Sequence, residues 1–298
     1  MRAIVAPSNH PMNLDLLQVS EMTFDYTNCE QLTPQTPGTS PTSLTFTQMP
    51  NFNYRLRSKD AKAPFDPPQY AFINSSSPSQ QAQCIIQFDV PADLPAVVLL
   101  YYKLTNFYQN HRRYVKSLDS DQLKGKFVST KKLNSGDCKP LAVASDGRAI
   151  YPCGLVANSF FNGESEHTLP SSPTSPHVLP DTYSALVAKD GTSNYTFSQS
   201  GIAWPGEAKK YTSKPDYPLD QIVPPPNWAK KFPNGYSNST PPPDLRANEH
   251  FQNWMRTSGL PTFTKLWGRN DGDSLKKGTY LITVDLSMCI SYDEKALY

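Results

Sequence analysis

The chain has 298 residues, and 28 Lys and Arg residues against 26 Asp and Glu residues leave a formal net charge of +2. This balance excludes the strongly basic surface of a typical nucleic-acid-binding protein, so no nucleic acid is expected as a partner. With 29 Pro against 14 Gly, helix-breaking residues are too frequent for a helical bundle, a coiled coil or a doubly wound α/β fold.

Five segments show the alternation of apolar and polar residues, or the short apolar run, that predicts a β-strand. In chain order, the predicted strands span 20–28, 43–48, 84–90, 97–105 and 280–290. In the second, Leu44 and Phe46 are expected to face inward, and the fourth is apolar on both faces, as a central strand would be. The last places Tyr280, Ile282 and Val284 on one apolar face, which is typical of an antiparallel sheet.

The connecting segments are rich in Pro, Ser and Thr, and irregular structure is expected over 31–42, 59–83 and 169–180. One helix is predicted where Asn248 can cap an N-terminus and Gly259 can end the helix.

Strands at both ends of the chain, with long irregular segments between them, predict one all-β domain over residues 1–298. We expect an antiparallel two-sheet β-sandwich with a few short helices and long Pro-rich loops.

The five cysteines show no spacing typical of a zinc site. Cys138 and Cys153 flank a short loop that suits a local disulfide, and Cys29 and Cys84 flank a longer one. Such bonds would stabilise the fold by about 3 and about 4 kcal/mol in the chain-entropy model. Five buried free thiols fit the spacing equally well. Cys289 lies on the more polar face of the last predicted strand and is the candidate unpaired thiol.

The sequence holds few motifs for glycosylation, membrane spans or catalysis. Asn74, Asn194 and Asn238 begin N-x-S/T sequons, a number that chance would also produce in a chain so rich in Asn, Ser and Thr. No apolar run reaches the roughly 18 residues of a membrane span, and the N-terminus lacks the apolar core of a signal peptide. Hydrolase, phosphate-loop, zinc-protease and dinucleotide motifs are absent, so no cofactor and no metal are expected.

The segment 106–116, NFYQNHRRYVK, is the densest chemical feature of the chain. Its aromatics and its cations Arg112, Arg113 and Lys116 fit a phosphate-binding or nucleic-acid-binding patch. They also fit a structural segment leaving a central strand, with the Arg side chains bonded to carbonyls and the aromatics filling the sheet edge. The near-neutral charge of the chain favours the structural interpretation.

The longer stretch YYKLTNFYQNHRRYVKS, at 101–117, closely resembles the signature of the ligand-effect-modulator (cell-division-cycle-fifty) family. These proteins are accessory β-subunits of type-IV P-type ATPases, the phospholipid flippases. Further colinear segments that resemble the family are FDYTNCE, CGLVANSFFN, GIAW, PPNW, WMRTSGLPTFTKLW and GTYLITVDL. Together the resemblance covers nearly the whole chain.

The resemblance implies an asymmetric antiparallel β-sandwich that forms the exoplasmic domain between two membrane helices, both absent from this sequence. It implies disulfides Cys29–Cys84 and Cys138–Cys153, and N-glycans. Some relatives carry a sequon just after the NSFFN-like segment, whereas Asn162 is followed here by Gly and Glu, so glycan positions do not transfer.

The family's function would be non-catalytic. Such a subunit binds the exoplasmic side of the ATPase and supports its folding, its exit from the endoplasmic reticulum and its transport cycle. It would reside in the endoplasmic reticulum, Golgi, endosome or plasma membrane. Arg112 and Arg113 could also meet a phospholipid headgroup. The candidate partner-binding residues are Asn106, Tyr108, Asn110, His111, Arg112 and Arg113.

Two other functions fit the residues alone. A secreted lectin-like β-sandwich would use exposed aromatics and Pro-rich loops to bind sugars. A hydrolase would need a cleft with a carboxylate pair or a His–carboxylate pair of perturbed pKa. For Trp204, Trp228 and Trp254, core packing or loop anchoring is favoured over an interface role.

Overall fold

The structure, a computed structural model, describes residues 2–7, 19–36, 43–74, 82–160, 182–229 and 231–286. Its strands are β1 Arg2–Pro7, β2 Glu21–Asp25, β3 Thr47–Gln48, β4 Phe52–Arg55, β5 Gln69–Ile73, β6 Gln83–Val90, β7 Val98–Leu104, β8 Ala149–Ile150, β9 Thr182–Tyr183, β10 Leu186–Ala188, β11 Asn194–Tyr195, β12 Ile222–Val223, β13 Phe263–Asn270 and β14 Gly278–Asp285. Its α-helices are α1 Arg112–Lys116, α2 Ser120–Leu123, α3 Thr130–Ser135, α4 Leu155–Asn158 and α5 Glu249–Met255. Its 3-10 helices are η1 Cys29–Gln31, η3 Ser58–Asp60, η4 Glu207–Lys210, η5 Leu219–Gln221 and η6 Pro226–Trp228.

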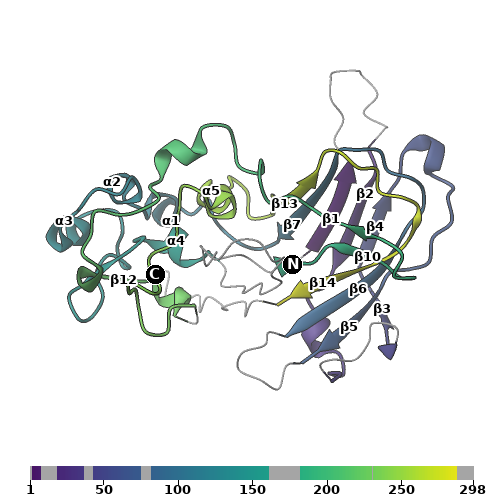
Figure 1. Cartoon of the computed structure of the whole chain (residues 1–298), viewed down its shortest axis with the longest axis horizontal. Helices are drawn as coiled ribbons and strands as arrows, with labels where there is room; N and C mark the ends of the chain where they lie inside the picture. Colours follow the sequence, from purple (N-terminus) through teal and green to yellow (C-terminus); the bar gives the residue numbers. More distant parts are fainter. Residues whose placement is uncertain are drawn as a thin grey trace.

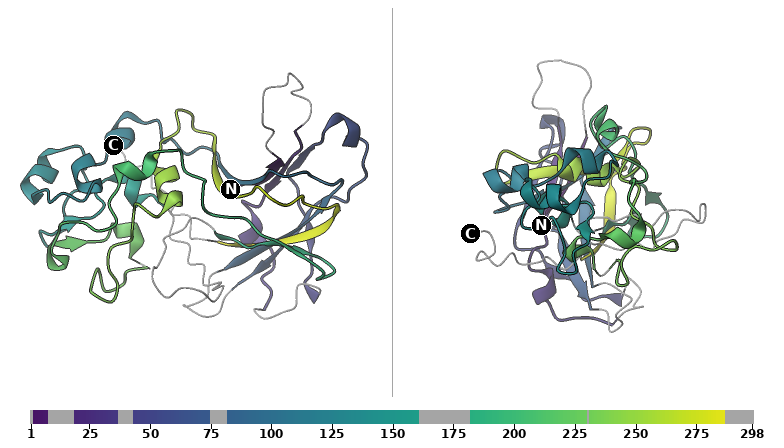
Figure 2. Two further views of the ribbon diagram at one scale, coloured as in Figure 1. Left: turned by 45° about the horizontal axis from the view of Figure 1, so that its top comes forward. Right: turned by 90° about the vertical axis from the view of Figure 1, so that its left-hand side faces the viewer.

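Two antiparallel sheets confirm the predicted all-β class. One is ordered β13-β7-β1-β2-β4, and the other β11-β10-β14-β6-β5-β3 with β9 also paired to β14. Figure 1 shows these sheets at one end of the molecule, and a lobe of short helices and irregular chain at the other. Figure 2 shows the same division from two further directions.

The two sheets are joined through their facing side chains. The rings of Phe24 on β2 and Phe88 on β6 lie 4.6 Å apart between centroids, so the alternation seen in both strands does point into one core. A disulfide between Cys29, in η1 after β2, and Cys84 on β6 ties the chain that follows β2 to the second sheet, with Cα atoms 6.1 Å apart. The core of the sandwich therefore combines apolar packing with a covalent cross-link.

The second lobe has an aromatic core around α4. Trp228 and Trp254 are fully buried, and their indole N–H groups donate to the carbonyls of Ala157 and Val156 at 3.1 and 3.0 Å. Because a buried indole N–H needs an acceptor, these two bonds fix both rings against the helix. A second disulfide, Cys138–Cys153, braces the same lobe, with Cα atoms 5.6 Å apart.

The expected strand over 43–48 is mostly absent, since β3 comprises only Thr47 and Gln48. The side chain of a residue ten positions earlier holds this segment instead. The amide of Gln35 donates to the carbonyl of Thr45 at 2.8 Å and accepts from the Thr45 N–H at 2.9 Å. These bonds take the place of a ladder partner, so the segment lies over the sheet as a loop.

The expectation of irregular structure over 59–83 was wrong for β5, which pairs with β6 along five residues. The expectation that β14 has one apolar face was also incomplete. A small second cluster on the outer side of the sheet comprises Leu44, Ala71, Ile73, Ile85 and Leu281, with Phe46 packed against it. The 43–48 loop covers that face, which is why residues on both sides of these strands are apolar.

The strand predicted over 97–105 is confirmed as the interior strand β7, between β13 and β1. Its residues alternate between buried and half-buried, so only one face is fully covered. The predicted helix is α5, and the Asn248 side chain accepts the N–H of Phe251 at 2.8 Å as its cap. The helix ends at Met255 instead of continuing to Gly259. The segments 169–180 and 287–290, with Cys289, lie outside the described residues.

A candidate docking surface formed by three loops

Three segments distant in sequence meet beside the aromatic lobe: 106–116, 199–206 and 256–261. We call them together the loop surface. The first and third are joined by direct hydrogen bonds. The N–H of Phe107 donates to the carbonyl of Pro261 at 3.0 Å, and the Asn110 side chain donates to the carbonyl of Gly259 at 3.2 Å. The segment that follows β7 is therefore fixed to the chain between α5 and β13.

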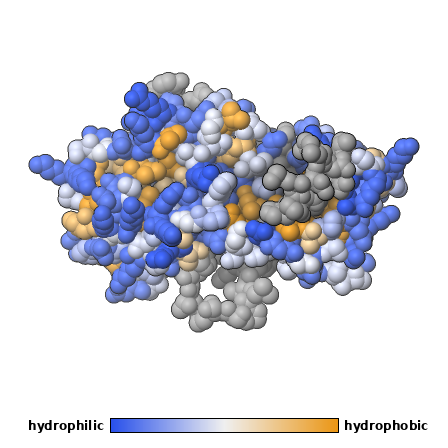
Figure 3. Space-filling model, turned by 90° about the horizontal axis from the view of Figure 1, so that it is seen from above, coloured by the Kyte–Doolittle hydropathy of each residue, from blue (hydrophilic) through white to orange (hydrophobic). Residues whose placement is uncertain are grey.

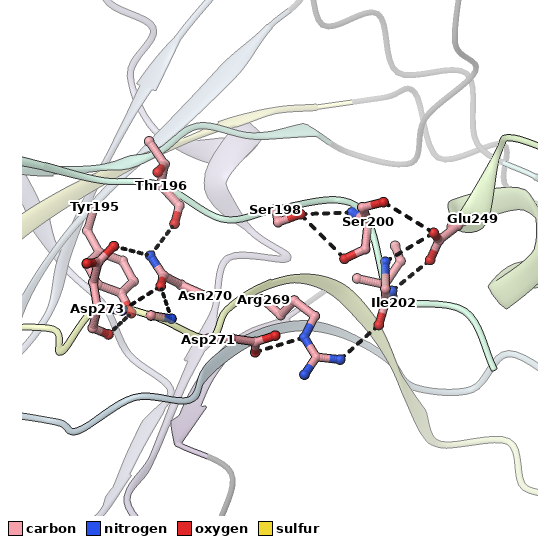
Figure 4. Close-up of polar contacts among 12 residues, drawn as sticks. Tyr195, Thr196, Ser198, Ser200, Ile202, Glu249, Arg269, Asn270, Asp271 and Asp273 are labelled. Carbon is pink, nitrogen blue, oxygen red and sulfur yellow. Dashed lines mark hydrogen bonds and ion pairs between the residues drawn. The ribbon is translucent and has the colours of Figure 1, made fainter. Parts of the chain in front are cut away.

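The second segment is held by Glu249, the first residue of α5. Its carboxylate accepts the backbone N–H groups of Gly201, Ile202 and Ala203 at 3.0, 2.7 and 2.9 Å. Figure 4 shows this carboxylate facing the backbone of the 200–202 turn. Three charge-assisted bonds to consecutive amides leave the backbone before Trp204 little freedom.

The other side of the same turn is fixed by β13. The guanidinium of Arg269 donates to the carbonyl of Gly201 at 2.9 Å and pairs with Asp271 at 2.9 Å (Figure 4). The side-chain oxygen of Asn270 accepts the Asp273 N–H at 2.9 Å, within its own turn. The NDGD sequence thus closes a turn that supports the loop surface.

Trp204 is 60% exposed, whereas Trp228 and Trp254 are fully buried. Of the two expected roles, core packing or loop anchoring, Trp228 and Trp254 show core packing, whereas Trp204 lies outside the core. The guanidinium carbon of Arg256 lies 3.8 Å from the centroid of the Trp204 ring, a cation–π contact. One face of the indole is supported in this way while much of the ring stays exposed to solvent.

Lys265 on β13 positions Arg256. Its ammonium is buried and donates to the carbonyls of Asn253, at 2.9 Å, and of Arg256. These acceptors lie at the end of α5, where backbone carbonyls have no partner within the helix, so Lys265 satisfies them. Burial, with a smaller contribution from the positive charge of Arg256, lowers the pKa of Lys265 to about 8.

Two of the three aromatic residues of 106–116, Phe107 and Tyr114, pack inward as the structural interpretation predicts, whereas Tyr108 is exposed. Phe107 makes edge contacts with Tyr114, Trp254 and Phe263, and the hydroxyls of Tyr114 and Ser159 hydrogen-bond at 2.6 Å. The expectation that the arginines bond carbonyls is wrong. Their side chains are exposed on α1, and no such bond forms within the part of the chain that the structure describes.

The six candidate partner-binding residues differ in their surroundings. Asn106 has a φ of 57°, a left-handed conformation that Asn tolerates, and Asn110 is used internally by its bond to Gly259. Tyr108 is 61% exposed. His111 precedes α1 without a side-chain capping bond and, like Arg112 and Arg113, is exposed.

Sequence reasoning missed Leu260, which is 67% exposed on the segment bonded to 106–110, and the roles of Glu249 and Arg256. Their one signal was their position inside or beside the WMRTSGLPTFTKLW stretch.

Figure 3 shows small apolar patches set among hydrophilic side chains on the face that it views. The Asn of each sequon, Asn74, Asn194 and Asn238, is exposed.

Comparisons with known proteins agree with this picture. The family described as "LEM3 (ligand-effect modulator 3) family / CDC50 family" matches residues 14–292. The phospholipid-transporting ATPase accessory subunit CDC50 of Chaetomium thermophilum is 35% identical over 90% of this chain and 63% of its own length. The accessory subunit CRF1 of Saccharomyces cerevisiae is 36% identical over 96% of this chain and 65% of its own length. Human cell cycle control protein 50B is 33% identical over 67% of this chain and 55% of its own length.

The chain thus spans slightly less than two thirds of the length of the two fungal relatives. Among the described residues, no helix is both long enough and apolar enough to cross a bilayer.

Proposed function

The chain belongs to the LEM3/CDC50 family, and from this premise we propose that it acts as a non-catalytic accessory subunit of a phospholipid-transporting, type-IV P-type ATPase. Residues 1–298 would form one exoplasmic domain that binds the exoplasmic side of the ATPase. ATP hydrolysis would then belong to the partner. The printed names of the fungal relatives support the assignment of this partner.

The observation that carries the proposal is the loop surface. It presents Tyr108, Trp204 and Leu260, each at least 60% exposed, on segments whose backbones are fixed by hydrogen bonds. Tyr, Trp and Arg are the residue types that contribute most to binding at protein interfaces. A rigid backbone lowers the entropy lost on docking. The surface therefore has the composition and the preorganisation of a docking site.

We infer that binding through this surface supports the folding of the ATPase, its exit from the endoplasmic reticulum and its transport cycle. The test is to express the full-length protein together with candidate phospholipid-transporting ATPases. The expected result is co-elution in mild detergent, with the ATPase reaching the Golgi or plasma membrane only in the presence of the subunit. Failure of every candidate to co-elute, with unchanged trafficking, would reject the function.

A further inference from the structure

A hollow of about 580 Å³ lies beside α1, and we call it the α1 hollow. Its charged lining residues are Arg112, Arg113, Lys116, Lys139 and Asp137, and His111 also lines it. Four cations against one carboxylate leave an excess of three positive charges, which is more than the +2 of the entire chain. The balance of charge over the rest of the protein therefore conceals a strongly positive local site.

The cations of the α1 hollow differ from two neighbouring lysines in having no ion-pair partner among the described residues. Nearby, Lys126 and Lys132 both pair with Asp121, at 2.9 and 3.4 Å. Within the described ranges, none of the four hollow cations lies within salt-bridge distance of a carboxylate. Arg112 and Lys116 are four residues apart on α1, where like charges destabilise a helix. The stability of the fold therefore does not account for this cluster.

The walls of the hollow are fixed. The bond between the Tyr114 and Ser159 hydroxyls holds α1 against α4. Two other lining residues, Asp137 and Lys139, flank Cys138, which is cross-linked to Cys153. A ligand would thus find the positive charges already placed, and little ordering entropy would be lost on binding.

We propose that the α1 hollow binds an acidic polypeptide segment of the partner ATPase, an inference that rests on the function proposed above. Arginine side chains form bidentate hydrogen bonds with carboxylates, and the two adjacent arginines can bind two acidic residues. Asp137 can only accept hydrogen bonds, which suits the backbone N–H groups of a peptide and not the oxygens of a phosphate.

The shape of the site also favours a polypeptide over a membrane surface. A surface that binds a bilayer needs several apolar side chains to enter the lipid beside its cations. On α1 the exposed large apolar residue is Val115, with 40% of its surface accessible. A concave site lined by charged residues fits a protruding loop.

The direct test uses the 298-residue chain and a fluorescent octapeptide of glutamate, with an octapeptide of glutamine as the neutral probe. We expect the glutamate peptide alone to bind, and to bind more weakly at about 300 mM than at about 50 mM NaCl. R112E/R113E should weaken binding at least about tenfold. K59E/K62E, the same charge change on exposed lysines near η3, should leave it unchanged. Equal binding by R112E/R113E and wild type would overturn the proposal.

A second test uses the full-length subunit and its ATPase. If the wild type and K59E/K62E co-elute with the ATPase and R112E/R113E does not, the inference is supported. If all three co-elute equally, the inference fails while the proposed function stands. If no form co-elutes, the proposed function fails and the peptide test alone decides the inference.

Binding to vesicles that contain phosphatidylserine distinguishes a lipid ligand from a polypeptide ligand. Loss of vesicle binding in R112E/R113E, with ATPase binding unchanged, would assign the hollow to lipid headgroups and overturn the proposal. Thermal melting of each variant checks that the fold is intact.

Discussion

The guanidinium of Arg256 lies 3.8 Å from the ring centroid of Trp204, and each residue depends on a separate set of bonds for its position. The Arg256 carbonyl accepts from the buried ammonium of Lys265. The three backbone amides of 201–203, just before Trp204, are held by Glu249. An exposed indole is thus fixed in place by contacts with α5 and β13, which is the arrangement expected of a preformed docking residue.

Replacing Trp204 with alanine should weaken binding to the ATPase and leave the fold intact. We expect a loss of about 2 kcal/mol, roughly thirtyfold in affinity, as for other interface tryptophans. The loss of folding stability should not exceed about 1 kcal/mol, the value of an exposed cation–π contact. Co-elution with the ATPase and thermal melting measure the two effects.

The matched control is Trp254→Ala, which removes a fully buried indole and should cost about 3 to 5 kcal/mol of folding stability. A W204A variant that melts as early as W254A, or that binds the ATPase as wild type does, would contradict the assignment of Trp204 to the docking surface.

Replacing Glu249 with alanine should release the 200–204 segment, because three amides lose their acceptor. We expect a loss of about 1 to 3 kcal/mol in the free energy of unfolding. Hydrogen exchange at residues 201–203 should accelerate before that of the sandwich core. Glu249→Gln, which keeps one carbonyl acceptor, should fall between the alanine variant and wild type. Unchanged exchange at these amides in E249A would show that the carboxylate does not hold the loop.

Stability should rise with pH between about 8 and 10 because of Lys265. Its pKa is about 8 in the folded state and 10.5 ordinarily, so in this interval the unfolded chain binds more protons at this group and the free energy of unfolding increases. Above about pH 10 the trend should reverse. Burial raises the pKa of Tyr54, Tyr151, Tyr211 and Tyr236, so the folded state retains protons that the unfolded chain releases.

Urea denaturation at a series of pH values measures this profile. Lys265→Met should remove the rise below pH 10 and keep the fall above it. Lys59→Met, at an exposed position, should keep both. A rise that survives in K265M would mean that another group causes it.

The two disulfides should contribute unequally to the free energy of unfolding. In the chain-entropy model, Cys29–Cys84, with a sequence separation of 55, contributes about 4 kcal/mol, and Cys138–Cys153, with a separation of 15, about 3 kcal/mol. C29A/C84A should therefore destabilise the sandwich more than C138A/C153A destabilises the helical lobe. Urea unfolding of each double variant, and peptide mapping without reduction, provide the measurements. Mapping that finds Cys289 in either bond would contradict the pairing.

Glycosylation is expected at Asn74, Asn194 and Asn238, because the Asn of each sequon is exposed in the structure. Expression of the full-length protein in a eukaryotic secretory pathway, followed by enzymatic deglycosylation, should lower the mass at each occupied site. Each single Asn→Gln variant should lack the mass of one glycan. A protein whose mass does not change on deglycosylation would reject all three sites.

Local patterns in the sequence were sufficient to predict the class of fold. Period-two alternation in β2, β6 and β14 reflects the pleat of a strand, which depends on neighbouring residues alone and is therefore visible in any short window. The Asn248 cap of α5 was visible for the same reason, since the cap and the N–H that it binds are three residues apart. The family resemblance depended on colinear motifs and needed no contact to be known.

Only the tertiary structure decided which of these residues are exposed and which support others. Trp204 and Trp254 are the same residue type, yet one is 60% exposed and the other buried, because burial depends on which distant segments fold over a position. In the same way, Lys265 on β13 reaches back and binds a carbonyl at the end of α5. The positive site beside α1 exists because the disulfide and α4 bring Lys139 to the helix that carries Arg112. Contacts between segments far apart in the chain, which no local pattern encodes, created both the docking surface and the α1 hollow.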